Sequence, residues 1–297
     1  MSKIFAIMVT YRRPDFAEST SRAIFDQTLP PDHLWVVDND PSEELSGFFS
    51  AQENCTYLPQ ASNLGPAGGI AVGMTAVLEN AGDDDWILLV DDDDPPHSTH
   101  VIENLSALIN RAPSKRLGGV ALTGGLYDAR RGVMRRILDE DLSGILVTDC
   151  LAGNQCPMYS IRAIRDVGTF DVKLFFGFEE LEFGLRLRRQ GWDLLFDGHT
   201  ALELRRVNGR MNLGHRSPRR SDMPAWRKYY SARNALVIAW RYGSWTAVLV
   251  TLTGALFVSP WRELRHGRPI GAAFVTARGA FDAMRGRLGK TVEPGSK

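Results

Sequence analysis

Four consecutive aspartates, Asp91, Asp92, Asp93 and Asp94, directly follow the apolar run at residues 86–90. A short, unbroken apolar run is typical of a buried parallel strand, and ligands bind beyond the carboxyl ends of such strands. Adjacent carboxylates repel one another unless a cation or a set of hydrogen-bond donors holds them. The run therefore predicts a site for a hard divalent metal that also carries a phosphate ligand.

An acidic run is more often a solvated surface loop than a binding site. The run Asp83-Asp84-Asp85, which lies just before the same strand, is expected to be such a loop. The run at residues 91–94 differs because it stands at the exit of the strand, and this position favours a metal site. An EF-hand is excluded, because these aspartates are not alternately spaced along a loop with the required glycine and closing glutamate. A dehydrogenase is disfavoured, because no G-x-G-x-x-G follows a strand.

Strand and helix patterns alternate along the chain. Apolar runs predict strands at residues 4–9, 34–37, 86–90, 119–123, 145–148 and 158–161. Helical patterns are expected at residues 14–27, 66–80, 98–111 with Ser98 as the cap, 226–240, and from the acidic cluster at Glu179 to Gly191. The alternation predicts an α/β fold with a largely parallel central sheet flanked by helices.

Three segments near the C-terminus have distinct patterns. Residues 205–222 are rich in arginine and interrupted by glycine, and we expect a mobile loop there. Residues 247–258 are apolar but too short to span a bilayer, which needs about 20 residues, so they predict a core or interfacial helix. Residues 274–288 place apolar side chains at helical spacing with arginines between them, which suits a helix on a membrane or one packed against protein equally well.

Length and cysteine content indicate the broad class of protein. With 297 residues, 44% of them hydrophobic and 24% charged, the chain suits one large globular domain or two packed halves. Its three cysteines, Cys55, Cys150 and Cys156, are an odd number without metal-ligand spacing. Residues 1–3 lead into a strand instead of a signal peptide. These features predict a cytoplasmic protein with reduced thiols.

The formal net charge of zero conceals opposite charges on the two parts of the chain. Residues 201–297 contain 18 Lys and Arg against 5 Asp and Glu, whereas residues 1–200 contain 17 against 30. The basic part is interleaved with apolar stretches, which suits an anionic membrane surface better than nucleic acid. We therefore expect peripheral contact with a membrane and no nucleic-acid partner.

Five motifs occur in an order that resembles a known family. They are VTYRRP at residues 9–14, VVDND at 36–40, NLGPAGG at 63–69, the aspartate run, and Glu179-Glu180. This succession is similar to that of family 2 glycosyltransferases of the GT-A fold, over about residues 1–240. Within that family, residues 29–34, 36–40, 63–74, 209–211 and 229–234 look most like actinobacterial galactofuranosyltransferases of cell-wall polysaccharide assembly, and the related rhamnosyltransferases share most of these features.

The resemblance implies that three regions of the chain have different functions. It places a nucleotide-sugar-binding half at residues 1–130, an acceptor-binding half at 131–222, and a C-terminal helical region at 223–297 that contacts a membrane or another subunit. The implied cofactor is Mn²⁺ or Mg²⁺, held by Asp91, Asp93 and His215, with His199 as the other candidate histidine. The residues implied around the nucleotide sugar are Thr10, Tyr11, Arg13, Asp38, Asn63, Gly65, Gly68, Asp91 and Asp92.

The glycines of that set have a second interpretation. Gly65, Gly68 and Gly69 equally suit a tight turn before a packed helix.

The resemblance also assigns Glu180, with Glu179 beside it, as the base that takes the proton of the acceptor hydroxyl. Glu182 is expected to point elsewhere on the helix. Single displacement at the sugar carbon inverts its configuration, so no nucleophilic Ser, Cys or His triad is required. The implied activity is transfer of a sugar, with galactofuranose as the first candidate, from a UDP-sugar to a lipid-linked glycan at the inner face of the plasma membrane.

Three alternatives remain open from the sequence. They are a rhamnosyltransferase that uses a dTDP-sugar, a sugar nucleotidyltransferase, and a non-catalytic protein that binds sugar nucleotides. The second normally has a glycine-rich loop with basic residues after its first strand, where this chain has residues 10–14. The sequence leaves open the donor sugar, the acceptor and linkage, the choice of metal, and the oligomeric state.

Overall fold

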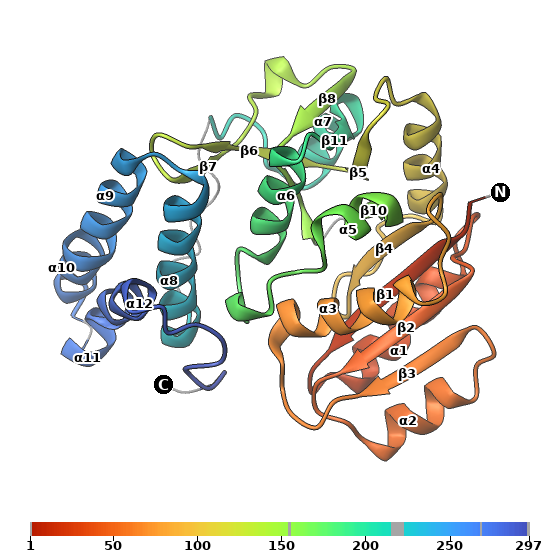
Figure 1. Ribbon diagram of the computed structural model, residues 1–297, viewed down its shortest axis with the longest axis horizontal. Helices are drawn as coiled ribbons and strands as arrows, with labels where there is room; N and C mark the ends of the chain where they lie inside the picture. Colours follow the sequence, from red (N-terminus) through yellow and green to blue (C-terminus); the bar gives the residue numbers. More distant parts are fainter. Residues whose placement is uncertain (1, 154–155, 215–222, 268, 296–297) are drawn as a thin grey trace.

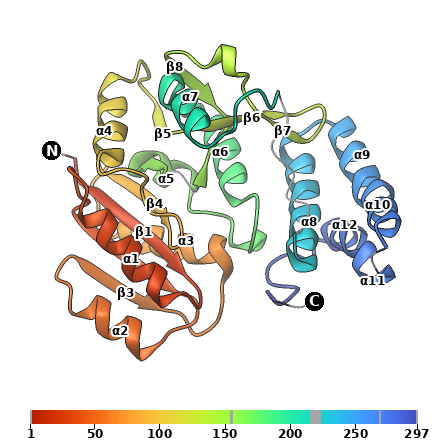
Figure 2. The same cartoon turned by 180° about the vertical axis from the view of Figure 1, so that it is seen from behind.

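The computed structural model describes residues 2–153, 156–214, 223–267 and 269–295. Within these residues a mixed sheet of eight strands forms the centre, and a block of C-terminal helices lies beside it (Figures 1 and 2). The strand order is β3-β2-β1-β4-β10-β5-β11-β8. The strands are β1 (Ile4–Thr10), β2 (His33–Asp38), β3 (Cys55–Pro59), β4 (Trp86–Asp91), β5 (Leu117–Ala121), β8 (Ile145–Thr148), β10 (Met158–Ser160) and β11 (Asp193–Asp197).

The pairing of the strands is mostly parallel, as the alternation of strands and helices predicts. β3, β2, β1 and β4 are parallel neighbours, and β5 is parallel to β11. The short strand β10 runs antiparallel between β4 and β5, and β8 runs antiparallel to β11. A second, small sheet has the order β7-β6-β9, made by β6 (Gly124–Asp128), β7 (Val133–Arg135) and β9 (Cys150–Leu151).

Helices cover both faces of the large sheet. One face carries α1 (Pro14–Phe25), α2 (Glu43–Ser50) and α4 (Val101–Arg111); the other carries α3 (Gly65–Leu78), α5 (Ile161–Val167) and α6 (Glu179–Arg189). The remaining helices are α7 (Gly198–Val207), α8 (Ala225–Tyr242), α9 (Trp245–Thr253), α10 (Ser259–Arg265), α11 (Ile270–Ala273) and α12 (Val275–Met284). Short helical turns are η1 (Asp139–Asp141), η3 (Val172–Leu174) and the π-helical η4 (Gly254–Val258).

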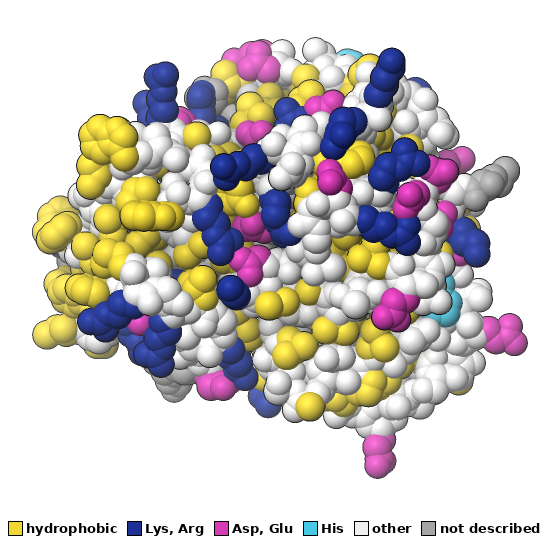
Figure 3. All heavy atoms as spheres, viewed as in Figure 1, with side chains coloured by type: hydrophobic (Ala, Val, Ile, Leu, Met, Phe, Trp, Pro, Cys, Tyr) yellow, Lys and Arg dark blue, Asp and Glu magenta, His cyan; other side chains and the backbone are white. Residues whose placement is uncertain are grey.

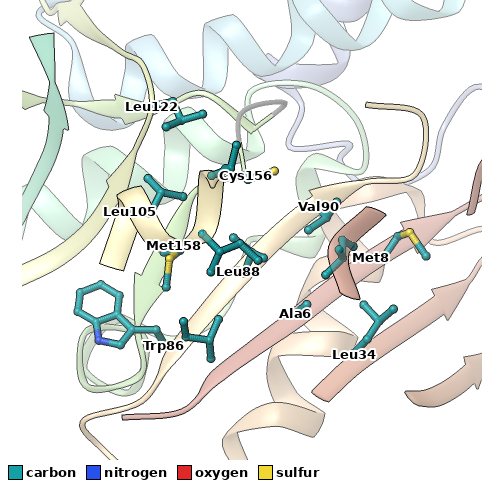
Figure 4. Packing of buried hydrophobic residues seen from close by; sticks show 14 of the residues in the cluster. Ala6, Met8, Leu34, Trp86, Leu88, Val90, Leu105, Leu122, Cys156 and Met158 are labelled. Atoms are coloured by element: carbon teal, nitrogen blue, oxygen red, sulfur yellow. The ribbon is translucent and has the colours of Figure 1, made fainter. Parts of the chain in front are cut away.

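Alternation along the central strand builds the two halves of the core. In β1, Ala6 and Met8 are buried on the face that also holds Leu88 and Leu105 (Figure 4), whereas Ile7 is buried against the opposite helices. Successive side chains of a strand point to opposite faces, so an apolar run in a central strand fills both layers at once. Strand β4 pairs with β1 and is buried in the same way, through Leu88 on one face and Leu89 on the other. The core therefore sets the position of the carboxyl end of β4, where the aspartate run begins.

Three predicted elements differ from the observed ones. Helix α4 begins at Val101, so the N-cap position falls on His100 and not on Ser98, whose carbonyl oxygen accepts a hydrogen bond from Gln27. Helix α7 begins after the Asp197 cap and continues to Val207, into the segment expected to be a loop, where Arg205 donates to the carbonyl of Ile137 and to Asp139. Helix α12 is shorter than the predicted 274–288, because Gly286 takes a positive φ.

The predicted division of the chain stays a prediction. The boundary proposed at residue 130 falls within the hairpin of β6 and β7. The rest of the expected loop, residues 215–222, lies outside the described residues.

The C-terminal block is built around the packing of α12 on α8. Gly279 permits this contact, because a Cβ there would lie 2.5 Å from the carbonyl oxygen of Tyr229. The hydroxyl of Tyr229 donates a hydrogen bond to Asp282, which is buried in the same contact. None of the helices in the described ranges combines the length and the apolar character that crossing a membrane requires.

Gly279→Ala tests this packing. The added methyl group meets backbone of α8, which cannot rotate away, so we expect a loss of about 1–3 kcal/mol in the free energy of unfolding. The matched control is Gly271→Ala in α11, where no atom lies within 4 Å of the added Cβ. Urea denaturation of the two variants measures the difference, and equal stability would contradict the described contact.

Candidate active site

A cleft of about 1100 Å³ opens at the carboxyl ends of β1 and β4. The whole aspartate run lines it, and so do Glu179 and Glu180 at the start of α6. The two acidic motifs are almost 90 residues apart in the sequence. The fold therefore brings them into one cavity, at the sheet edge where ligands bind in α/β proteins.

Asp92 is the anchored member of the aspartate run. Its buried carboxylate accepts hydrogen bonds from the Thr10 hydroxyl at 2.9 Å and from the Arg13 guanidinium at 3.3 Å. Its carbonyl oxygen accepts from the hydroxyl of Thr20 at 2.7 Å. Burial raises the pKa of Asp92, and the contacts from Thr10 and Arg13 oppose this rise. Because its oxygens are used in these bonds, Asp92 positions the run.

Asp91 carries the most perturbed carboxylate of the run. Its side chain is reached by solvent from the cleft, yet protein surrounds it on the other sides. Burial, followed by the nearby charges of Glu180 and Asp93, raises the pKa of Asp91 to about 7. A carboxylate crowded by other carboxylates is a position where a cation would be stabilising.

Asp93 is half exposed and forms an ion pair with Arg13, which thus contacts two aspartates of the run. Within the described part of the chain, no three Asp, Glu, His or Cys side chains are arranged to hold a metal ion by themselves. The oxygen donors of Asp91 and Asp93 do suit a hard divalent cation, provided that other oxygens complete its coordination. Phosphate oxygens and water are the ligands that such cations commonly add.

The second acidic group consists of Glu179 and Glu180. Glu179 is buried, and its Oε2 atom has no hydrogen-bond partner among the described residues. Burial, together with the neighbouring Glu180, raises the pKa of Glu179 well above its usual range, and burial also raises the pKa of Glu180. Two adjacent buried carboxyls do not both ionise readily, so the pair favours one proton and one negative charge.

The surroundings of Glu180 leave little free space. Its Oε1 atom occupies the volume that a Cβ on Gly153 would need. Glu182, by contrast, does not line the cleft; its carboxylate accepts from Arg186 at 2.9 Å and from the hydroxyl of Tyr242 at 2.6 Å. The prediction that Glu182 points elsewhere is confirmed.

The structure places most of the predicted nucleotide-binding residues at the cleft. Besides Asp91 and Asp92, the lining includes Thr10, Tyr11, Arg13, Asn63 and Gly65. Gly68 is an exception, because it lines a neighbouring cavity of about 760 Å³ and a Cβ there would lie 2.7 Å from the Cβ of Leu64. This close approach supports the packing interpretation for Gly68.

Asp38 is the clearest departure from the predicted site. Its side chain is fully buried, and it accepts hydrogen bonds from the hydroxyl of Tyr57 at 2.7 Å and from the backbone N–H of Asp40 at 2.9 Å. It does not line the cleft, so direct reading of a nucleotide base by its carboxylate does not fit this structure. The reason is that β3 pairs with β2 and brings Tyr57 onto the carboxylate.

Of the two histidines considered as metal ligands, only His199 belongs to the residues that the structure describes. His199 is exposed on α7 and is absent from the residues that line the cleft. His215 lies outside the described residues.

Several residues of the cleft were not predicted. Asn39 joins the end of β2 to the start of α3, because its amide oxygen accepts from the N–H of Leu64 at 3.1 Å and its amide nitrogen donates to the carbonyl of Gly65 at 3.3 Å. It stands within the VVDND motif, next to the predicted Asp38. The further lining residues include Arg210, whose stretch 209–211 carries part of the family resemblance but was given no role, and Trp226, Arg227, Pro294 and Gly295, which none of the motifs includes.

Comparison with known proteins identifies the domain that holds this cleft. Residues 5–129 match glycosyl transferase family 2. The galactofuranosyltransferase GlfT1 of Mycolicibacterium smegmatis is 34% identical over 204 residues, which cover 63% of this chain and 66% of that protein. GlfT1 of Mycobacterium tuberculosis is 31% identical over 202 residues, which cover 63% and 65%. The alignments thus span just under two thirds of the length of these relatives.

Solved structures show the fold. The mannosyltransferase PcManGT from Pyrobaculum calidifontis, in complex with GDP-Man and Mn²⁺, superposes with a TM-score of 0.54 at 14% identity and covers 95% of this chain and 80% of that one. GalNAc-T7 with UDP, GalNAc and Mn²⁺ gives a TM-score of 0.55 at 12% identity, with coverage of 96% and 58%. The predicted GT-A fold is confirmed. Residues 5–129 of this chain form a glycosyl transferase family 2 domain, within a GT-A fold that extends over nearly the whole chain.

Proposed function

We propose that this chain is a metal-dependent inverting glycosyltransferase that moves galactofuranose from a UDP-sugar to a hydroxyl of a lipid-linked glycan. The observation that carries the proposal is the meeting of the aspartate run and the Glu179-Glu180 pair in one cleft. The names of the relatives at 31–34% identity support galactofuranose as the sugar. The GT-A neighbours, solved with nucleotide or nucleotide sugar, support the donor class.

Asp91 and Asp93 are the residues that would hold a divalent cation, Mn²⁺ or Mg²⁺. Both structural neighbours were solved with Mn²⁺, which supports the need for a divalent ion without distinguishing the two metals. The cation, when bound, neutralises the diphosphate that leaves the sugar. Arg13 now pairs with Asp93, and its release would allow the guanidinium to reach phosphate oxygens.

The nucleoside part of the donor fits the side of the cleft formed by β1 and the start of α3. Tyr11 offers an aromatic side chain at this edge, and the backbone of Thr10 and Gly65 can approach a ligand closely. Asn39 holds the two walls together through its bonds to residues 64 and 65. Asp38 stabilises this wall through its hydrogen bonds to Tyr57 and to the backbone of Asp40, and it does not contact the nucleotide base.

Glu180 would act as the base, because it is the less buried glutamate of the pair. It takes the proton from the acceptor hydroxyl as that oxygen forms a bond to the anomeric carbon. The bond from this carbon to the diphosphate breaks at the same time, and the nucleoside diphosphate leaves with the bonding electrons. The raised pKa of Glu180 brings its basicity closer to neutral pH, where a general base is effective.

The C-terminal block supports access to a lipid-linked acceptor. Apolar side chains gather on the surface over these helices, with basic side chains beside them (Figure 3). The exposed large apolar residues of the segment from α8 to α12 are Trp240, Trp245, Leu249, Val250, Phe257, Val258, Trp261, Leu264, Ile270, Phe274, Phe281 and Met284. Exposed tryptophans and phenylalanines next to arginines are typical of a surface that enters an anionic membrane interface. We call this set the apolar C-terminal face.

A panel of nucleotide sugars separates this proposal from its alternatives. UDP-galactofuranose, dTDP-rhamnose and nucleoside triphosphates are each tested with Mn²⁺ for transfer to a lipid-linked acceptor and for release of pyrophosphate. We expect turnover of UDP-galactofuranose and release of UDP. Turnover of dTDP-rhamnose alone would assign the rhamnosyltransferase, and pyrophosphate release would assign the nucleotidyltransferase.

Asp91→Asn tests the cost of holding an ionised Asp91 in a buried position among other carboxylates, in the metal-free protein. The folded pKa of about 7 lies above the unfolded value, so the ionised Asp91 destabilises the fold and stability falls as pH rises towards and through 7. Removing the charge should therefore raise the free energy of unfolding at pH 8 by about 1 kcal/mol, a modest gain because solvent screens the site, with little gain at pH 4. The control Asp84→Asn, at a surface ion pair, should change stability little at either pH. If Asp91→Asn is less stable than the unaltered protein at pH 8 in EDTA, the ionised Asp91 does not destabilise the fold and the explanation is wrong.

Glu180→Gln and Asp93→Asn separate the base from the metal site. Glu180→Gln should lower transfer by roughly 10²–10⁴-fold and keep the thermal stabilisation by UDP with Mn²⁺, because only proton transfer is lost. Asp93→Asn should lose most of that stabilisation. The exposed Glu203→Gln on α7 is the control and should behave like the unaltered protein. Full transfer activity in Glu180→Gln would remove Glu180 from the proposed role.

Membrane contact is tested by replacing Trp245 and Trp261 together with serine. Sedimentation with vesicles of phosphatidylglycerol should fall by about tenfold or more, because each buried aromatic side chain contributes about 1.5–3 kcal/mol. The control Val207→Ser changes an 84%-exposed apolar residue outside the apolar C-terminal face and should bind like the unaltered protein. Unchanged sedimentation of the double variant would contradict the proposal, and loss of a dimer in ultracentrifugation would assign the face to a second copy of the chain.

A further inference from the structure

The turn that precedes Glu179 has an unusual backbone conformation. Phe175 and Phe178 both have positive φ values, 61° and 71°, and Gly177 between them has 80°. Residues with a Cβ seldom adopt this region, and they persist there only where the surrounding structure holds them. Phe178 is the residue directly before α6, so this turn sets where the helix and its two glutamates begin.

Helix α8 supplies the support through the side chain of Asn234. Its amide nitrogen donates to three carbonyl oxygens of the turn, those of Leu174 at 3.0 Å, Phe176 at 2.9 Å and Gly177 at 2.7 Å. The side chain is fully buried, so water does not replace these bonds. The Asn234 side chain thus holds the backbone of the turn both before and after Phe175.

Arg233 orients this amide and extends the network. Its Nε donates to the amide oxygen of Asn234 at 3.0 Å, which leaves the amide nitrogen facing the turn. Its Nη2 donates to the carbonyl of Leu174 at 2.7 Å, and its Nη1 to the carbonyl of Gly289 at 2.7 Å. The guanidinium therefore joins the turn before α6 to the C-terminal segment that lines the cleft with Pro294 and Gly295.

The same turn also contacts the donor side of the cleft. The carbonyl oxygen of Phe175 accepts from the N–H of Ala67 at 3.3 Å. It also occupies the space that a Cβ on Gly65 would need. Movement of the turn would therefore change the distance between the start of α3, beside the proposed nucleotide site, and the start of α6.

We infer that Arg233 and Asn234 are positioning residues, which act by holding the turn at residues 174–178 so that the Glu179-Glu180 carboxyls face the aspartate run. This inference rests on the proposed function of Glu180 as the base. Neither residue lines the cleft, so their effect on the reaction is exerted through the turn. Their position within the YYSARN stretch at residues 229–234 gives that motif a physical role.

Asn234→Ala is the test, with Lys228→Met as the matched control. Lys228 lies on the same helix, but its partly buried ion pair is with Glu263 of α10 and leaves the turn untouched. A shift of about 1 Å in a catalytic group costs on the order of 100-fold, so Asn234→Ala should lower kcat by about that factor. The affinity for UDP with Mn²⁺, measured by calorimetry, should change much less, and Lys228→Met should keep its kcat.

A double variant distinguishes positioning from general destabilisation. In the Glu180→Gln background, Asn234→Ala should cost little further activity, because the residue acts through the carboxyl pair. Hydrogen exchange should rise in residues 174–182 of Asn234→Ala and not in Lys228→Met. If Asn234→Ala does not fold, Arg233→Lys, which keeps the charge but not the forked contacts, carries the same comparison.

The outcomes separate the two proposals. Additive losses in the double variant, or an unchanged kcat in the folded single variant, would overturn the positioning role. Full activity of Glu180→Gln alone would instead overturn the assignment of the base, whatever Asn234→Ala does. Faster exchange throughout the protein in Asn234→Ala would show a general stabilising role and would contradict the inference.

Discussion

Repulsion among carboxylates held in one cleft is the constraint on which the rest of the site depends. Asp91 stands at the carboxyl end of β4, a strand buried on both faces, so the core sets where its backbone lies relative to α6. Burial, to which the charges of neighbouring carboxylates add at Asp91 and Glu179, raises the pKa of Asp91 to about 7 and raises the pKa of both glutamates. A protein that keeps such a group of acids gives up stability, and a cation with a charged ligand offsets the loss.

The surrounding structure serves to hold these acids in place. Thr10, Thr20 and Arg13 fix Asp92, so the run leaves β4 in one direction. On the opposite side, α8 fixes the turn before α6 through buried hydrogen bonds to backbone carbonyls. The GT-A sheet and the C-terminal block thus meet at the cleft, although the family 2 match covers only residues 5–129. The C-terminal block therefore contributes residues to the cleft and also forms the apolar C-terminal face.

Local patterns in the sequence were sufficient to predict one part of this arrangement. The apolar run before Asp91 and the acidic start of a helix at Glu179 are both local signals, and both elements are present. The burial of Asp38 could not be predicted, because it depends on Tyr57 in the neighbouring strand. The support of the turn by Asn234 joins residues about 60 apart in the sequence, and no periodicity reports such a contact. Tertiary hydrogen bonds account for what the sequence patterns missed.

The most direct test of the account is a calorimetric titration of UDP into the protein with Mn²⁺ and, separately, with EDTA. If the clustered acids require a cation before they accept a diphosphate, UDP should bind at least about tenfold more tightly with Mn²⁺, a difference of about 1.4 kcal/mol. Equal affinity in Mn²⁺ and in EDTA would contradict the central claim. UDP would then bind beside the aspartate run without a cation to offset the repulsion between carboxylates and diphosphate.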